Sequence, residues 1–416
     1  MDDLLLLVHR IPYPPNKGDK IRSWHLLRHL AARYRVHLAT FVDDQDDWQY
    51  VEHVRALCAS SHFAPLHPRM ARLRSLRALL ANRPLSLDYY SDSATRHWVH
   101  HTMAAGAIER IVVFSSPMAQ YVQKYDNARR VVDLCDVDSE KWRQYAGQKS
   151  WPASWVYAWE ARQLLVYERK VGAASDAALF VSQPEAQLFA TLAPESAGHI
   201  GWYGNGVDTA YFSPHVAYAN PYAAGARALV FCGAMDYWPN VDAVQWFARE
   251  VLPAVQAREP RARFVIVGAR PSPEVQALAA LPGVTVTGTV PDVRPYVAHA
   301  ALSVAPLRVA RGIQNKVLEA MAMAQTVVLT PQALEGIDAV PGRDVVAAGD
   351  AASFAAAVSA ELAAPGAVGA AARRLVEQAY GWDARLSALD ALLEAPAQRA
   401  VAPAPLKPAL AGWTEA

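Results

Sequence analysis

The chain has 416 residues, of which 53% are hydrophobic and 19% charged, so it carries ample apolar surface to bury and is not disordered as a whole. Its 40 basic and 39 acidic residues exclude a nucleic-acid-binding protein that acts through bulk charge. At about 100–200 residues per domain, this length predicts two domains.

Short apolar runs alternate with helical patterns along the whole chain. Continuous apolar runs are typical of parallel strands that are buried on both faces. The predicted strands of the first half are Leu4–Val8, Val36–Phe41, Ile111–Phe114, Val131–Leu134, Ala178–Val181 and His199–Trp202. Those of the second half are Leu229–Cys232, Phe264–Val267, Val284–Val286, Leu302–Ala305 and Val327–Leu329. With intervening helices such as Val241–Val255, Ile313–Met323 and Phe354–Leu362, this alternation predicts two doubly wound α/β domains.

The loop after the first strand is the first candidate for ligand contact. Gly18 permits a tight loop there, and Asp19 is a natural N-cap for the helix that follows. We expect this loop to point into the cleft between the domains, where Lys17, Asp19 and Arg22 approach a substrate. The competing interpretation is an ordinary strand–loop–helix connection that carries surface charges.

A basic amphipathic helix is predicted over residues 69–83, where five arginines are interleaved with leucines and a methionine. The simpler interpretation is a solvated helix face. The alternative is contact with anionic lipid headgroups.

Three aspartates end the fourth predicted strand, at positions 133, 136 and 138. A carboxylate at a strand end can act as a base or orient sugar hydroxyls, and we assign this catalytic role to Asp136. The Asp136-Val-Asp138 spacing imitates an Asp-x-Asp metal motif, but such pairs are common by chance and we expect no metal. Helix capping by Asp138 or Ser139 is the competing interpretation.

A turn-rich stretch over residues 203–227 separates the two halves. We therefore predict a first domain over 1–204, a linker over 205–227 and a second domain over 228–380. A C-terminal helix follows over 381–395, and then a disordered Ala/Pro-rich tail over 396–416.

Two glycines in the second half, Gly233 and Gly268, each follow a predicted strand. A glycine at such a turn permits close approach of a ligand to the backbone, and it also simply permits the turn. Neither stretch is a GxGxxG motif, so the sequence does not favour a nicotinamide cofactor. The sequence also contains no P-loop, HExxH or GxSxG motif.

The segment that starts at Pro306 carries the clearest chemistry, because it follows a strand and opens a helix. Gly312 lies at the turn, and Asn315, Lys316 and Glu319 share the polar face of the helix. A helix N-terminus and an ammonium suit a diphosphate, and a carboxylate one turn deeper suits a ribose diol. Lys316 is the only lysine between Lys170 and Lys407. The competing interpretation is an ordinary lysine–glutamate pair on a wet helix.

Taken together, these segments resemble the family 4 glycosyltransferases of the GT-B fold, and most closely the sugar transferases associated with PEP-CTERM/exosortase exopolysaccharide loci. The resemblance covers roughly residues 4–395. Its most specific parts are Pro14–Arg22, Asp133–Trp142, Asn205–Asp208, Pro239–Asp242 and Gly312–Ala322.

The resemblance implies two Rossmann-like domains facing across a cleft, of which the domain over 1–204 binds the acceptor, through Lys17, Asp19 and Arg22, and the domain over 228–380 binds a nucleotide-sugar. It also implies transfer with retention of anomeric configuration, and no bound metal or other cofactor. It places the ribose on Glu319, the diphosphate on Lys316 and the Gly312 turn, and Gly18 beneath the diphosphate and sugar. The family's second glutamate would stand at position 311, where this chain has an arginine. The family's basic residue after the first donor-domain strand is also absent. Its expected substitutes are Arg270, Arg308 and Arg311.

We therefore expect a retaining glycosyltransferase that acts on a lipid-linked saccharide acceptor in exopolysaccharide or cell-surface glycan synthesis. The alternatives are a nucleotide-sugar 2-epimerase of the same fold and a non-catalytic sugar-binding protein. Three widely spaced cysteines suit a reducing compartment, and the N-terminal residues lack the basic region of a signal peptide. We expect a cytoplasmic protein that contacts the inner membrane peripherally through residues 69–83, without a nucleic-acid partner.

Overall fold

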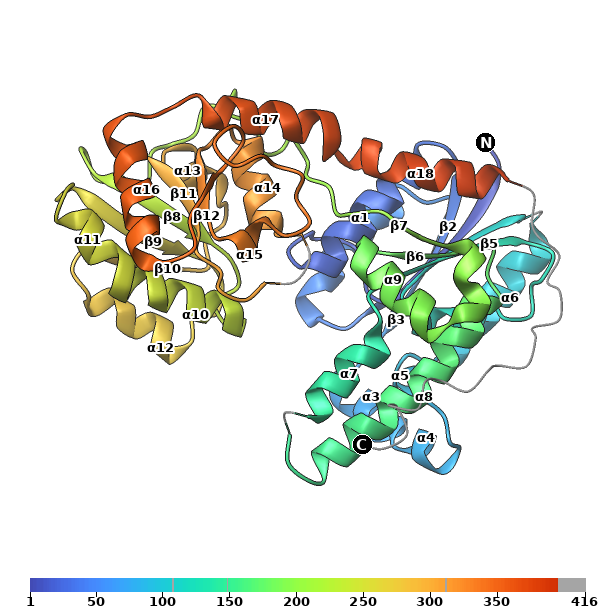
Figure 1. The fold of residues 1–416 in the computed structure, drawn as a ribbon. Helices are drawn as coiled ribbons and strands as arrows, with labels where there is room; N and C mark the ends of the chain where they lie inside the picture. Colours follow the sequence, from blue (N-terminus) through green and yellow to red (C-terminus); the bar gives the residue numbers. More distant parts are fainter. Residues whose placement is uncertain (107, 148, 311–312, 396–416) are drawn as a thin grey trace. The chain divides into compact units, whose positions relative to one another are not determined.

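A computed structural model describes residues 1–106, 108–147, 149–310 and 313–395. The chain divides into two compact units, which are described separately. The first unit comprises Met1–Gly204 and residues 386–395, and the second unit comprises Asn205–Arg385. Each unit is built around one parallel sheet with helices on its faces (Figure 1).

The sheet of the first unit has seven strands in the order β3-β2-β1-β4-β5-β6-β7, and every pairing is parallel. The central strand β1 has an apolar run, Leu4–Val8, whose side chains are fully buried, as a strand covered on both faces requires. The order reverses between β1 and β4. The strand bounds are β1 Asp3–Val8, β2 Arg35–Val42, β3 Ser60–Pro65, β4 Arg110–Phe114, β5 Arg129–Cys135, β6 Ala177–Phe180 and β7 Ile200–Trp202.

The helices of the first unit follow the strands in the expected alternation (Figure 1). The α-helices are α1 Gly18–Ala31, α2 Val51–Arg55, α3 Pro68–Ser75, α4 Arg77–Leu80, α5 Leu85–Tyr89, α6 Ser93–Ala105, α7 Asp138–Ala146, α8 Ala153–Ala173 and α9 Gln183–Leu192. Short 3-10 helices are η1 Gln45–Tyr50, η2 Ser116–Tyr121 and η3 Pro194–His199.

The sheet of the second unit has six parallel strands in the order β10-β9-β8-β11-β12-β13, which reverses between β8 and β11. The strands are β8 Arg227–Cys232, β9 Ala262–Val267, β10 Val284–Gly288, β11 Leu302–Ala305, β12 Val327–Leu329 and β13 Val346–Ala347. The α-helices are α10 Trp238–Trp246, α11 Leu252–Gln256, α12 Pro273–Gln276, α13 Arg294–Ala298, α14 Asn315–Ala322, α15 Pro331–Leu334, α16 Ala351–Ala363 and α17 Val368–Ala379. A π-helical turn, η4 Phe247–Val251, joins α10 to α11, and a 3-10 turn, η5 Ala277–Ala280, follows α12.

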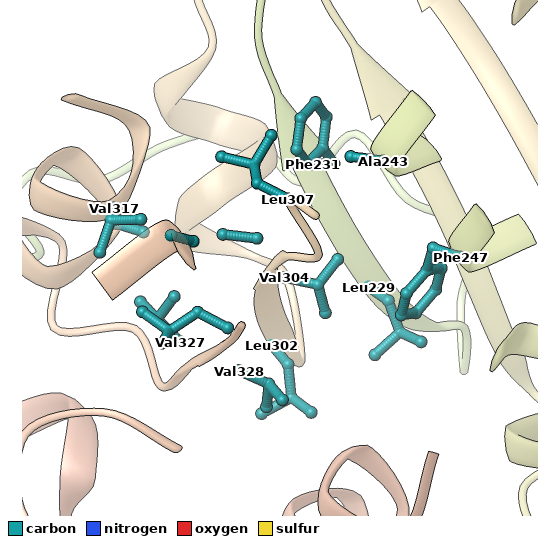
Figure 2. Close-up of a cluster of buried hydrophobic side chains, with 14 of the residues drawn as sticks. Leu229, Phe231, Ala243, Phe247, Leu302, Val304, Leu307, Val317, Val327 and Val328 are labelled. Atoms are coloured by element: carbon teal, nitrogen blue, oxygen red, sulfur yellow. The ribbon is translucent and has the colours of Figure 1, made fainter. Parts of the chain in front are cut away.

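The core of the second unit anchors α14 against the sheet. Val317, Leu318 and Met321 are fully buried, as expected for a helix with one polar face, whereas Ile313 is half-buried. Figure 2 shows Val317 in the same apolar cluster as side chains of β8, β11 and β12. The polar face of α14 is thereby held in a fixed orientation beside these strands.

Two sequence predictions about local structure are wrong. The predicted helix over 69–83 is broken at Leu76 into α3 and α4. Asp19 does not cap α1: the helix already begins at Gly18, and Lys17 occupies the N-cap position without a side-chain cap. The carboxylate of Asp19 instead accepts a hydrogen bond from Nη1 of Arg10 at 2.8 Å. This charged hydrogen bond takes the place of a bond to the backbone N–H groups of the helix.

The last described helix, α18 Trp382–Glu394, begins in the second unit and from Leu386 onward belongs to the first. The predicted tail over 396–416 lies outside the described residues. Within the described part of the chain, no single helix is both long and apolar enough to cross a membrane. Only α16 and α17 taken together, bent by 102°, reach that length and composition.

Candidate active site

The reversal of strand order between β8 and β11 marks where a ligand of the second unit is expected. In sheets of this kind, ligands bind beyond the carboxyl ends of the strands at the point of reversal. The side chains of Lys316 and Glu319 lie at this position. Together with Cys232 on β8 and Ser303 on β11, they line a small cavity of about 10 Å³.

The ammonium of Lys316 is held by groups from three other positions of the second unit. Its Nζ donates a hydrogen bond to Oδ1 of Asn240 at 2.5 Å and lies 4.7 Å from the ring centre of Phe231. A Cβ atom placed on Gly233 would lie 3.4 Å from the same Nζ, so the ammonium sits against the backbone at the end of β8. Burial lowers the pKa of Lys316 to about 8, although the charge of Glu319 opposes this shift.

The carboxyl group of Glu319 has an unmet capacity for hydrogen bonds. Among the described residues, no side chain or backbone group donates a hydrogen bond to it or forms an ion pair within 4 Å. Burial raises the pKa of Glu319 to about 7, and the charge of Lys316 opposes this rise. Because a half-buried carboxylate without donors is costly, this group is better explained by a ligand that supplies donors than by the fold alone.

Asn240 is the site residue that sequence reasoning missed. It is 4% exposed, and its Nδ2 donates to the carbonyl oxygen of Ala234 at 2.9 Å, which turns Oδ1 toward Lys316. A Cβ atom on Gly233 would lie 2.8 Å from Nδ2 of Asn240, so a glycine is needed at this turn for the two side chains to approach. The only signal in the sequence is a polar residue within the Pro239–Asp242 segment.

Three other predicted donor-site residues lie near this turn or in the segment before α14. A Cβ atom on Gly268 would lie 1.7 Å from the carbonyl oxygen of Gly233, so the packing of two strand ends already requires a glycine there. Arg270 pairs with Asp236 at 3.1 Å and Arg308 with Asp242 at 3.0 Å, so each exposed guanidinium has an acidic partner.

The turn before α14 is only partly described. Arg311 and Gly312 lie outside the described residues. Oδ1 of Asn315, the first residue of α14, is buried and has no hydrogen-bond partner among the described residues. A buried acceptor atom without a donor is unusual, and it is adjacent in the chain to Lys316.

In the first unit, the start of α1 places a glycine with free space around it beside charged side chains. Nothing lies within 4 Å of a Cβ atom placed on Gly18, and Lys17 is exposed. Asp19 lies 3.4 Å from Nε2 of His9 in addition to its contact with Arg10. Burial opposes ionisation of Asp19, but the hydrogen bond from His9 and the charges of His9 and Arg10 hold its pKa well below the usual value.

Arg22, predicted at the acceptor, is 2% exposed and engaged within the first unit. Its Nε donates to Asp133 at 2.8 Å, its Nη1 donates to the carbonyl oxygen of Tyr203 at 3.0 Å, and its guanidinium lies 3.6 Å from the centre of the Tyr203 ring. The hydroxyl of Tyr203 also donates to Asp133. This network joins α1, the end of β5 and the chain after β7. Within it, the carboxylate of Asp133 neutralises the charge of Arg22.

Asp136, the predicted catalytic carboxylate, lies just before α7 and is half-exposed. Nζ of Lys141 donates to Asp136 at 2.7 Å and to Asp138 at 3.2 Å. Neither Asp138 nor Ser139 caps α7, because Val137 is the N-cap residue and the hydroxyl of Ser139 donates to Glu168 instead. Asp136 therefore remains accessible and carries a cationic neighbour.

Comparison with known proteins agrees with the fold and points to one class of enzyme. Residues 226–363 match the model of a family described as "Glycosyl transferases group 1", which supports a glycosyltransferase. This region contains Gly233, Asn240, Lys316 and Glu319. No curated protein matches the sequence.

The chain is also similar to solved structures over nearly its whole length. A sucrose-phosphate synthase from Thermosynechococcus elongatus is 17% identical, with a TM-score of 0.64 over 94% of this chain and 98% of that chain. HepE from Anabaena in complex with UDP is 12% identical, with a TM-score of 0.63 over 94% of this chain and 99% of that chain. WaaG, a glycosyltransferase involved in lipopolysaccharide biosynthesis, is 15% identical, with a TM-score of 0.60 over 94% and 98%. These likenesses show the GT-B fold, with two Rossmann-like domains.

Proposed function

We propose that this protein is a retaining glycosyltransferase that takes a sugar from a nucleotide-sugar donor, and that its second unit binds the nucleotide. One observation carries the proposal: Lys316 and Glu319 lie together at the point where the strand order of the second sheet reverses. The first supplies an ammonium, and the second supplies a carboxyl group that receives no hydrogen bond from the described residues. That position is where sheets of this order bind nucleotides. Support for UDP as the nucleotide comes from HepE, whose solved structures hold UDP and UDP-glucose.

Lys316 is assigned to the diphosphate. Its ammonium lies at the start of α14, where unpaired backbone N–H groups and the helix dipole also favour an anion. Asn240 and Phe231 fix its position before the ligand arrives, so little order has to be gained on binding. Oδ1 of Asn315, which has no hydrogen-bond partner among the described residues, can accept a hydrogen bond from a hydroxyl of the nucleotide-sugar.

Glu319 is assigned to the ribose. Two adjacent hydroxyls of a ribose can each donate a hydrogen bond to the two oxygens of one carboxylate. A bound ribose would therefore satisfy the acceptors that the described protein groups leave open. It would also favour the ionised form, because hydrogen bonds to a carboxylate stabilise its charge.

The chemistry of transfer follows from where charge develops. The bond between the anomeric carbon and the β-phosphate oxygen breaks, and negative charge grows on the leaving diphosphate. Lys316 and the N-terminus of α14 stabilise that charge. The acceptor hydroxyl attacks the anomeric carbon from the same face of the sugar, its proton passes to the carboxylate of Asp136, and the nucleoside diphosphate leaves. Asp136, the loop residue Lys17 and Gly18 at the start of α1 are the groups of the first unit that we assign to this half of the reaction.

The acceptor that we propose is a lipid-linked saccharide in exopolysaccharide or cell-surface glycan synthesis, which the protein reaches from the cytoplasmic side of the inner membrane. Support comes from the similar structure of WaaG, a glycosyltransferase involved in lipopolysaccharide biosynthesis. The exposed arginines and leucines of α3 and α4 are further support.

The test is a thermal-shift screen of nucleotide-sugars, followed by a transfer assay with the stabilising donor. We expect release of free nucleoside diphosphate only when a lipid-linked saccharide is added, and its loss in Lys316→Met. A rearranged nucleotide-sugar formed without an acceptor would identify an epimerase instead. Stabilisation by free sugars but by no nucleotide-sugar would identify a sugar-binding protein.

A further inference from the structure

Helices α3 and α4 turn their large apolar side chains away from the protein. The residues of this segment that pack inward are small, namely Ala71, Ser75 and Ala78. The large apolar side chains are exposed, and Leu80 is 94% exposed. The others are Met70, Leu73 and Leu76. This is the reverse of an ordinary surface helix, whose large apolar residues face the core.

The charges of the same segment are all positive. Residues 68–83 contain five arginines and no acid. Arg74 donates to the backbone carbonyl oxygens of Asp88 and Tyr89, and Arg83 pairs with Asp88 at 2.7 Å, so these two hold the segment onto α5. Three further arginines are exposed and form no ion pair with any described residue; they are Arg69, Arg72 and Arg77.

A second exposed apolar group occupies the end of the α7–α8 pair. Trp151, in the connection between the two helices, is 81% exposed. Trp155 on α8 and Tyr145 on α7 are also exposed. The acidic residues of α7 lie at its opposite end, where Glu140 pairs with Arg143 and Asp138 with Lys141. The aromatic end is therefore free of acidic side chains among the residues described.

The two groups belong to one side of the first unit. Gln163 on α8 donates to Oδ1 of Asn82, just after α4, at 3.0 Å. Glu160, one turn earlier on α8, accepts hydrogen bonds from the backbone N–H groups of Leu85 and Ser86. Trp155 lies on the same helix, about one and a half turns before Glu160. Figure 1 shows α3, α4, α5 and the α7–α8 pair on the same side of the sheet.

We propose that this surface, made of α3, α4 and the end of the α7–α8 pair, docks on an anionic lipid bilayer. Arginines around exposed leucines and a methionine combine attraction to anionic headgroups with apolar insertion. Tryptophan and tyrosine favour the boundary between headgroups and hydrocarbon. Exclusively positive charge around an exposed apolar centre is complementary to such a surface. The proposal goes beyond nucleotide binding and requires no residue of the second unit.

The test is co-sedimentation of the full chain with vesicles, in the absence of nucleotide. One set of vesicles is phosphatidylcholine alone, and the other contains about a third phosphatidylglycerol. We expect binding to the anionic vesicles only, weakened by added salt. Arg69→Gln/Arg72→Gln/Arg77→Gln is expected to lower the partition coefficient about 100-fold, at about fivefold per arginine.

The apolar contribution is tested by two further variants. Leu73→Ser/Leu80→Ser and Trp151→Ser/Trp155→Ser are each expected to lower binding about tenfold or more, even at low salt. Matched controls lie in the second unit: Val216→Ser/Val340→Ser changes two exposed valines, and Arg249→Gln/Arg258→Gln changes two exposed arginines. Both controls should bind like the unmodified chain.

Three results would overturn the proposal. One is equal binding of the unmodified chain to both kinds of vesicle, or to neither. Another is a loss of binding in the controls as large as in the variants of the surface. The third is a change of oligomeric state in these variants without a change in vesicle binding, which would identify a contact between copies of the chain. A melting temperature that is unchanged in the variants without nucleotide shows that they are folded and keeps this test separate from that of the nucleotide site.

Discussion

Replacing Glu319 by glutamine should stabilise the protein while it weakens nucleotide binding. In the folded state, burial raises the pKa of Glu319 from 4.5 to about 7. That rise corresponds to about 3 kcal/mol of stability lost when the carboxyl ionises, because one pKa unit is worth about 1.36 kcal/mol. A buried glutamine amide without partners costs about 1 kcal/mol or more in its place. The net expectation for Glu319→Gln is a gain of about 2 kcal/mol above neutral pH.

The pH dependence gives this prediction a definite sign. Between pH 4.5 and about 7 the folded state holds a proton on Glu319 that the unfolded state has released, so stability falls as pH rises through this window. The variant has no such proton. The variant should therefore be about 1 kcal/mol less stable than the parent protein below pH 4.5, where both side chains are neutral, and about 2 kcal/mol more stable above about pH 7.

Thermal denaturation across this pH range measures the effect. For a domain of this size, about 1 kcal/mol shifts the melting temperature by roughly 2–4 °C, so an increase of about 4–8 °C is expected at alkaline pH. Glu335→Gln is the control, because Glu335 is exposed in the same unit and no shift is expected. A variant that melts below the parent protein above pH 7 would refute the reasoning, since it would mean that the carboxylate is satisfied by the fold.

The remaining predictions concern the groups around this site and the buried network of the first unit. Lys316→Arg should keep UDP binding above pH 8, where the affinity of the parent protein falls as Lys316 loses its proton; calorimetry at several pH values measures this. Asn240→Ala should weaken UDP binding by about 1–3 kcal/mol and move that loss of affinity to lower pH, because the ammonium loses its acceptor. Gly268→Ala should destabilise the second unit by about 3 kcal/mol or more in urea denaturation, because its Cβ meets a carbonyl oxygen at 1.7 Å. Asp133→Asn should cost about 3–5 kcal/mol in the same assay, because it leaves the buried charge of Arg22 unpaired, and an unchanged midpoint would contradict this.

The sheets were predictable because their central strands are buried on both faces. Every predicted apolar run overlaps a strand of the structure, from β1 to β12. The two strands that were missed lie at sheet edges: β3, Ser60–Pro65, is only partly buried, and β13 has two residues. An edge strand needs no continuous apolar run, so hydrophobic periodicity does not identify it.

The site was predictable only in part, because its geometry depends on contacts between distant segments. Lys316 and Glu319 could be named from one helix and its preceding turn. Asn240 could not be named, because it is 76 residues away in the chain from Lys316, whose ammonium it holds in place. Arg22 and Asp133 each looked available to a ligand, and only the fold shows that they neutralise one another. A charge in a sequence does not reveal its partner.

The most direct test of the nucleotide site is calorimetric titration of UDP into the full chain and into Lys316→Met near neutral pH. Binding of UDP by the unmodified chain is expected, with an affinity about 10- to 100-fold lower in the variant, the amount that a hydrogen bond to a charged group contributes. Equal affinity of two folded proteins, or no binding of any nucleoside diphosphate to the unmodified chain, would contradict the assignment of Lys316 and α14 to the donor.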